Sequence, residues 1–262
     1  MTNTDTDTNT NKNSQAATEL LKRRSSAPQK NRLAAEIRPA SLEDALAIQQ
    51  QMIAQRPDKV AGWKCLLPLD QDKVIVAPIF ADTIQQSNQC KLFSDNKVAR
   101  IEPEIAFVFA KDLPAQQQDY NESEIDTAIA SCHMALELIQ SRFDKDSGAE
   151  FNELLADCLS NQGLFIGPEL SKSVAYAASK INLTVTQSSH VQEFAGQHPN
   201  LSAQKPLYWL INYLTKRGID FKAGQAIITG SYAGVIEVNF EQKCEVEYHG
   251  IGKFQVEFKA IP

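Results

Sequence analysis

The chain has 262 residues and a net charge of −6, with 43% hydrophobic and 22% charged residues, which is typical of a globular protein. The sequence has no basic block, so nucleic acid and anionic membranes are excluded as expected partners. No apolar run approaches the roughly 18 residues that a membrane-spanning helix needs.

The N-terminus and the cysteines indicate a reducing compartment. Residues 1–17 are rich in Asn and Thr and lack the apolar core of a secretory signal, so we expect a disordered tail and a cytoplasmic location. The five cysteines are odd in number and widely spaced, which argues against a disulfide framework or a zinc site. We expect them to be small buried side chains.

Two helices are predicted in a helical N-terminal segment, residues 18–58. The first is short and ends near the basic pair at Arg24. The second follows Ser41, which is a suitable N-cap. Its apolar residues recur at helical spacing: Leu42, Ala45, Ile48 and Met52.

The segment 59–262 is predicted to be a β-rich catalytic domain. Apolar and β-branched runs between turn residues indicate strands at 60–69, 73–84, 99–110, 134–139, 162–168, 180–187, 225–230, 234–240, 244–252 and 253–261. One helix is expected to open near Ser123, and its buried face would be formed by Ile125, Ile129 and Cys132. Another covers 206–218 and ends at Gly218. Because few helices alternate with the strands, we expect an α+β fold.

The stretch RIEPEIAFVF places Glu102 and Glu104 in a predicted strand. Residues two apart in a strand face the same side, so both carboxylates project together, while Ile101 and Phe107 face the core. Two like charges in a low-dielectric setting repel unless a cation offsets them. The alternative is that this end of the strand is solvated and both carboxylates lie in water.

A third carboxylate, Glu137, lies between Leu136 and Leu138 in a second apolar strand. Three converging carboxylates form a hard oxygen site, which suits Mg²⁺ or Mn²⁺ and leaves positions for water and a chelating substrate. The alternative for Glu137 is an ion pair with Arg142.

Several short motifs occur in order between residues 18 and 260. They are GWK, FADTI, EPEIAFVFAKDLP, ALELIQSRF, LADCLSNQGLFIG, GQHPN, PLYWLINYLTKRGIDFKAGQAIITGS and GVIEV. The ordered set resembles the bacterial 2-keto-4-pentenoate hydratases, in the hydratase and decarboxylase branch of the fumarylacetoacetate hydrolase superfamily. The resemblance implies a mixed β-roll of the fumarylacetoacetate hydrolase C-terminal-domain type. It also implies a divalent metal, a small 2-oxo acid or dienol substrate, and a homo-oligomer that can associate with a related decarboxylase or aldolase.

By this resemblance Glu102, Glu104 and Glu137 match the metal ligands, and Lys64 and Asp82 match the polar catalytic pair. We expect Asp82 to carry a proton to and from the substrate, and Lys64 to stabilise negative charge on it.

The substrate-binding positions are predicted near these residues: Leu66, Leu67, Asn161 and Ser231. The chain departs from the hydratases just after Lys64. The relatives tend to carry a glycine and then a hydroxyl residue there, whereas this chain has leucines and Pro68.

Several of these residues have purely structural alternatives. Lys64 can be a surface lysine with a buried stem, and Asp82 can cap a turn through Thr83. Ser231 lies between glycines that fit a plain hairpin as well as a ligand site.

Two further motifs favour structural roles. Asp157 and Asn161 precede a glycine, so they can shape a turn as well as line a pocket. For His198, in GQHPN, we expect a structural hydrogen bond rather than a catalytic role.

The leading functional hypothesis is a metal-dependent hydratase of a 2-hydroxy-2,4-dienoate, acting in the catabolism of aromatic ring-cleavage products. A decarboxylase of a 2-oxo-3-enedioate uses the same kind of site and stands second. An acylpyruvate C–C hydrolase ranks lower, because none of the four histidines lies in an obvious His/Glu motif. A non-catalytic partner subunit is the alternative from a different class.

Overall fold

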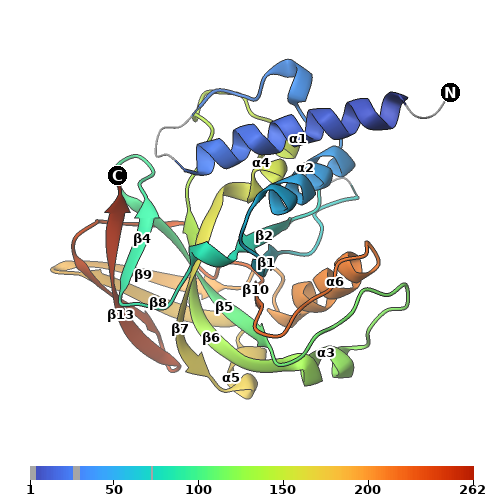
Figure 1. Cartoon of the computed structure of the whole chain (residues 1–262). Helices are drawn as coiled ribbons and strands as arrows, with labels where there is room; N and C mark the ends of the chain where they lie inside the picture. Colours follow the sequence, from blue (N-terminus) through green and yellow to red (C-terminus); the bar gives the residue numbers. More distant parts are fainter. Residues whose placement is uncertain (1–3, 26–29, 72) are drawn as a thin grey trace.

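Helices with complementary apolar faces cover one end of the molecule in the computed structural model, which describes residues 4–25, 30–71 and 73–262 (Figure 1). Helix α1 (Thr4–Arg24) buries Ala16, Ala17 and Leu20 against α2 (Leu42–Gln55). Residues 4–17 are therefore helical, which differs from the expected disordered tail, and residues 1–3 lie outside the described part. The tail's polar composition did not predict this helix, whose buried apolar side chains, among those that the structure describes, belong to its second half.

Helix α2 forms as its sequence predicts. The Ser41 side chain accepts a hydrogen bond from the Asp44 N–H, and Ala45, Ile48 and Met52 are fully buried. The helix packs against α4 (Phe151–Ala156), which the sequence did not reveal. Among the described helices, none is both long and apolar enough to cross a membrane.

Strands make up most of the remaining chain, in two sheets. Within the described residues the larger sheet has the order β2 (Val76–Phe80), β1 (Val60–Cys65), β10 (Ala226–Ile228), β5 (Ala99–Phe109), β6 (Ile129–Ile139), β7 (Asn161–Leu170) and β3 (Ile84–Gln85). Strand β11 (Ile236–Val238) also pairs with β5. Parallel and antiparallel pairs occur together in this sheet, so it is mixed.

The smaller sheet has the order β4 (Gln89–Phe93), β13 (Gly252–Ile261), β12 (Lys243–Tyr248), β8 (Lys180–Gln187) and β9 (His190–Gln197). Helices α3 (Glu122–Ala128) and α5 (Lys172–Ala177) lie at the opposite end of the molecule from α1, and α6 (Gln204–Thr215) lies between α2 and α3 (Figure 1). The two sheets form most of the fold, and the described helices lie at their edges and ends rather than alternating regularly with parallel strands, which fits the expected α+β class.

One predicted helix is shorter than expected. Helix α3 ends at Ala128, and Ile129 and Cys132 belong to β6. Ile125 is buried on α3 as predicted. Much of β6 is buried on both faces, so its apolar residues do not alternate with polar ones, and hydrophobic periodicity could not separate this strand from a longer helix.

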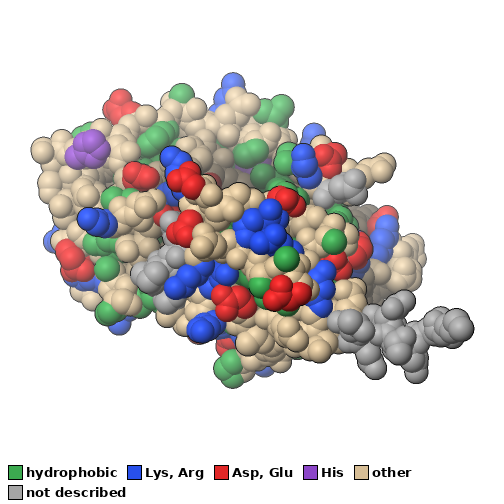
Figure 2. Space-filling model, turned by 90° about the horizontal axis from the view of Figure 1, so that it is seen from above, with side chains coloured by type: hydrophobic (Ala, Val, Ile, Leu, Met, Phe, Trp, Pro, Cys, Tyr) green, Lys and Arg blue, Asp and Glu red, His purple; other side chains and the backbone are tan. Residues whose placement is uncertain are grey.

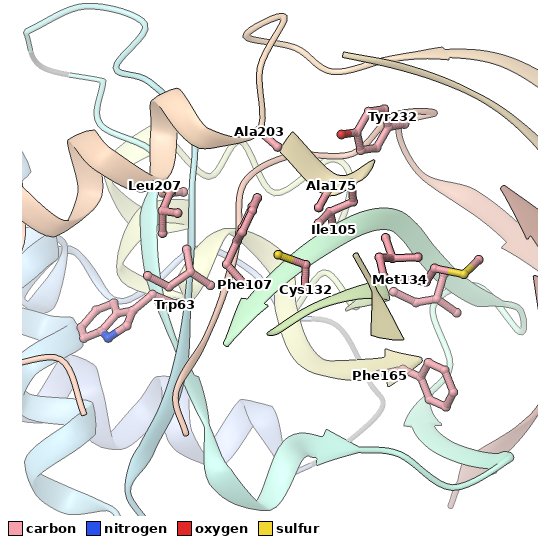
Figure 3. Packing of buried hydrophobic residues seen from close by; sticks show 14 of the residues in the cluster. Trp63, Ile105, Phe107, Cys132, Met134, Phe165, Ala175, Ala203, Leu207 and Tyr232 are labelled. Carbon is pink, nitrogen blue, oxygen red and sulfur yellow. The ribbon is translucent and has the colours of Figure 1, made fainter. Parts of the chain in front are cut away.

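The main apolar core lies between the larger sheet, α6 and the smaller sheet. Figure 3 shows Trp63 of β1, Phe107 of β5 and Cys132 of β6 close to Leu207 of α6. All five cysteines are buried and free, as predicted. On the face of the molecule seen in Figure 2, acidic and basic side chains are interleaved.

Candidate metal centre

The three predicted carboxylates meet on one face of the β5–β6 ladder. Glu102 lies directly opposite Glu137, and Glu104 is two residues farther along β5 on the same face. One oxygen from each carboxylate lies within 4.8 Å of the others. The predicted convergence of the three side chains is therefore confirmed.

This cluster is buried and strongly repulsive. Glu137 is fully buried and Glu104 is 2% exposed. At 4.8 Å, two carboxylates repel by about 3 kcal/mol at an effective dielectric of about 20. Burial, and then the charge of Glu137, raises the pKa of Glu102 to about 7 and that of Glu104 well above its usual value. The cluster needs positive charge to hold three carboxylates.

Lys64 supplies part of that charge. On β1, Trp63 and Cys65 face the main core, so Lys64 points to the opposite side, where its Nζ donates to Glu137 Oε1 at 2.6 Å. Burial opposes the charged ammonium, but Glu137 and Glu102 outweigh it and raise the pKa of Lys64. The surface alternative for Lys64 is wrong, because its side chain is only 12% exposed.

Two buried oxygens beside the cluster accept no hydrogen bond from the described residues, Glu137 Oε2 and Asn161 Oδ1. The other Glu137 oxygen accepts from both Lys64 and the Asn161 amide, at 2.6 and 2.9 Å. An unsatisfied buried carboxylate oxygen is costly. With three acidic oxygens within 4.8 Å, the donor set fits a hard divalent cation such as Mg²⁺ or Mn²⁺.

A glycine turn approaches the cluster from β10. The Gly230 N–H donates to Glu104 Oε2 at 2.6 Å. Gly230 has φ +126°, and a Cβ there would lie 2.5 Å from Leu66 Cδ2. Only glycine fits this position without strain, so the sequence TGSYAG is explained by a close approach of backbone to the site.

A strained turn supports the opposite side of the site. Cys158, Leu159 and Ser160, the 3₁₀ turn η3 (Cys158–Ser160), all have positive φ between 50° and 63°. The turn directs the Leu159 carbonyl to Lys64 Nζ at 3.3 Å and is followed by Asn161. Three such non-glycine residues in a row are held only by their surroundings.

A buried ion pair stabilises this strained turn. Arg142 Nε donates to Asp157 Oδ2 at 2.7 Å, and Arg142 Nη2 donates to the Asp157 carbonyl at 2.6 Å. The alternative pairing of Arg142 with Glu137 is therefore wrong. Burial raises the pKa of Asp157, against the opposing effect of Arg142.

Asp82 does not lie in this site, which corrects the predicted catalytic pair. Lys64 is opposite Ala77 in the β1–β2 ladder, while Val60, about 13 Å back along β1, is opposite Phe80. Asp82 follows Phe80, has a 60% exposed side chain and pairs with Arg56 at 2.7 Å. The FADTI motif gave its sequence position, but only the register shows which end of the strand it occupies.

Three other residues singled out from the sequence make structural hydrogen bonds near the site. Ser231 Oγ donates to the Gly234 carbonyl at 3.0 Å, which is the turn alternative. The Leu67 N–H donates to Asn200 Oδ1 at 3.2 Å, so its backbone anchors the segment after Lys64. His198 is fully buried, accepts from the Asn200 N–H at 3.1 Å, and has a structural role as expected.

Sequence reasoning missed three contributors, the Gly230 N–H, the Leu159 carbonyl and Arg24. Arg24 Nη1 donates to the Asn161 carbonyl at 2.8 Å. The first two are backbone groups, which no side-chain motif reports. The glycines around Ser231 were the one signal that pointed to a close backbone approach.

Known proteins resemble this chain at low identity, and no family model matches it. It is 24% identical over 162 residues to a 2-keto-4-pentenoate hydratase of Paraburkholderia xenovorans, covering 62% of this chain and 59% of that protein. It is 26% identical over 163 residues to a 2-hydroxyhexa-2,4-dienoate hydratase of Comamonas testosteroni, covering 61% and 60%. The chain thus spans about three fifths of the length of these relatives. The resemblance to the hydratases is confirmed.

Solved structures extend the likeness over nearly the whole fold. A 4-oxalocrotonate decarboxylase from Pseudomonas putida G7, complexed with magnesium and adipate, has a TM-score of 0.74 at 19% identity and covers 94% of this chain and 97% of that one. A fumarylacetoacetate hydrolase family protein of yeast has a TM-score of 0.52 at 16% identity, covering 76% and 92%. At these identities the likeness establishes the fold.

Proposed function

We propose that this relative of the 2-keto-4-pentenoate hydratases is a divalent-metal-dependent hydro-lyase that converts a 2-hydroxy-2,4-dienoate into a 4-hydroxy-2-oxo acid. The observation that carries the proposal is the meeting of Glu102, Glu104 and Glu137 within 4.8 Å, with Glu137 Oε2 buried and unsatisfied. The names of the curated relatives favour hydration of a dienoate, in catabolism of aromatic ring-cleavage products, over decarboxylation.

The three glutamates would hold Mg²⁺ or Mn²⁺. Bound there, the ion would supply a Lewis acid for the carboxylate and 2-oxygen of the substrate. The solved decarboxylase complexes with magnesium and with calcium support a divalent ion in this fold. Gly230 and Lys64 would keep Glu104 and Glu137 in place through the hydrogen bonds described above.

Lys64 would stabilise the negative charge of the substrate. Its ammonium is held by Glu137 and the Leu159 carbonyl, so it is oriented before any ligand arrives. A fixed cation in a buried site stabilises negative charge as it moves onto the enol oxygen. In the net reaction the enol hydroxyl on C2 loses a proton and C5 gains one, which leaves a C2 ketone and a C3–C4 double bond; water then supplies a hydroxyl to C4 and a proton to C3.

Asn161 and the leucines would orient the substrate. Asn161 Oδ1 is buried, and no described residue donates a hydrogen bond to it, so it can accept one from the substrate. Leu66 packs next to Gly230, so its apolar side chain would border the carbon chain rather than the carboxylate. We propose no role in proton transfer for Asp82, because its side chain is exposed and paired with Arg56.

The fold and domain assignments complete the proposal. We assign the mixed sheets to a β-roll of the fumarylacetoacetate hydrolase C-terminal-domain type, and residues 59–262 to the catalytic unit. Every residue assigned to the metal or substrate lies in that range, although Arg24 of α1 also contacts Asn161.

A substrate panel tests the proposed function. Loss of dienol absorbance is followed with Mg²⁺, with Mn²⁺ and with EDTA, beside a carbon dioxide assay. We expect metal-dependent loss of the dienol without carbon dioxide, abolished in Glu137→Gln and retained in Glu169→Gln, an exposed residue on β7. Stoichiometric carbon dioxide release would favour decarboxylation instead, and no metal-dependent turnover of any dienoate would refute the proposal.

A further inference from the structure

A second cavity, of about 430 Å³, is lined in part by Arg24, which contacts Asn161. It is lined by residues from distant parts of the chain, among them Leu21, Arg24, Arg56, Lys91, Phe93 and Ile261. The glutamates of the metal centre do not line it. It is therefore separate from the candidate active site, and the proposed function does not account for it.

Arg24 is the unusual residue in this cavity. Its Nη1 donates to the Asn161 carbonyl at 2.8 Å, whereas Nη2 is buried and has no hydrogen-bond partner among the described residues. Its guanidinium also lies over the Phe80 ring, 5.2 Å from the centroid. Burial and the neighbouring Arg142 lower the pKa of Arg24 to about 10, so it stays charged at neutral pH. A buried cation with one unsatisfied N–H group and no anionic partner destabilises the fold, and a bound anion would remove that cost.

The other arginines around the cavity already have acidic partners. Arg56 pairs with Asp58 at 2.6 Å and with Asp82 at 2.7 Å. Arg142 pairs with Asp157 at 2.7 Å. The acidic groups near the cavity are thus engaged, and Arg24 forms no ion pair with any described residue.

Lys91 and the apolar lining define the kind of anion. Lys91 is exposed at the cavity and has no ion pair with a described residue, so a second positive charge is available. Leu21, Phe93 and Ile261 contribute apolar surface, and the volume exceeds what an inorganic ion needs. We propose that this cavity binds an organic carboxylate, with its anionic group on Arg24 and Lys91 and a small apolar body against these three side chains.

The same arginine connects this cavity to the metal centre. Arg24 Nη1 binds the carbonyl of Asn161, and the side-chain amide of Asn161 binds Glu137 at 2.9 Å. A carboxylate that reorients the guanidinium therefore changes the position of a group bonded to the metal cluster. Binding at the two sites is expected to be coupled, and the coupling must be reciprocal.

Benzoate is a suitable probe, because it combines a carboxylate with a compact apolar ring. Calorimetric titration of the full chain, stripped of metal with EDTA and then dialysed free of it, reports this cavity alone, since three free carboxylates in the metal centre repel the probe. We expect saturable binding, weakened at least about tenfold in Arg24→Gln and about threefold in Lys91→Gln. The matched control is Lys180→Gln, an exposed lysine on β8 in the smaller sheet, which should bind benzoate like the wild type.

The outcomes separate the proposal from its rivals. Lys91→Gln alters only an exposed side chain, so it remains informative if Arg24→Gln fails to fold. Absence of saturable benzoate binding, or equal affinity in wild type and both variants, would overturn the proposal. Binding of inorganic phosphate but not of benzoate, with the same dependence on Arg24, would overturn the proposal that Leu21, Phe93 and Ile261 select an anion with an apolar body. Since no metal or turnover is involved, these results do not depend on the proposed hydratase activity.

Discussion

Replacing Glu102 with glutamine should change stability in opposite directions with and without metal. In the metal-free protein, Glu102 has a pKa of about 7 against a usual 4.5, chiefly because of burial and then the charge of Glu137. The difference corresponds to about 3 kcal/mol against the charged form of Glu102 in the folded protein. Removing the charge should therefore stabilise the metal-free fold.

The pH dependence follows from the sign of this pKa change. Between pH 4.5 and 7 the folded protein keeps a proton on Glu102 that the unfolded chain has lost. The destabilisation of the wild type is thus absent below about pH 4.5 and complete above about pH 7. At pH 8 in EDTA we expect Glu102→Gln to melt about 6–12 °C higher than the wild type, with the gap closing toward pH 5.

Metal reverses the order. At a free Mn²⁺ concentration 1,000 times its dissociation constant, the wild type gains about 4.1 kcal/mol, which exceeds its deficit of about 3 kcal/mol, and a variant lacking one ligand should gain little. Thermal melts with and without Mn²⁺ measure both effects, and Glu169→Gln should follow the wild type throughout. A Glu102→Gln variant that melts lower than the wild type in EDTA, or that keeps the full Mn²⁺ shift, would refute this reasoning.

Four other changes test individual parts of the site. Asp82→Asn should keep turnover within about threefold of wild type, because its side chain is exposed, whereas Lys64→Met should lose a factor of about 10² or more in the dienol assay. A large loss in Asp82→Asn would restore it to the mechanism. Gly230→Ala should lower the melting temperature and the metal affinity, since its Cβ would meet Leu66; an unperturbed variant would contradict the close approach. Arg142→Met should destabilise by about 3–5 kcal/mol in denaturant titrations, and a cost below 1 kcal/mol would show that the ion pair does not hold the turn.

The sequence predicted the acidic cluster because strand alternation is a short-range rule. Glu102 and Glu104 had to share a face once β5 was recognised. Glu137 was added from its place in an apolar strand and from the family resemblance, and the ladder then placed it opposite Glu102. The α+β class followed in the same way from the distribution of strand signals.

The sequence could not predict the register between strands distant in the chain, nor the backbone groups that contribute to the site. Asp82 was paired with Lys64 on motif order, but the β1–β2 register puts the two at opposite ends of the ladder. The left-handed turn before Asn161 has no glycine in its sequence, so nothing marked it as strained. The partners of Arg142 and Arg24 come from tertiary packing, which composition and periodicity do not specify.

Anomalous scattering from crystals grown with Mn²⁺ tests the central claim most directly. We predict one strong peak bounded by the carboxylates of Glu102, Glu104 and Glu137, absent from crystals of Glu137→Gln grown in the same solution. A peak elsewhere at saturating Mn²⁺, or none between these three side chains, would contradict the assignment of a metal centre.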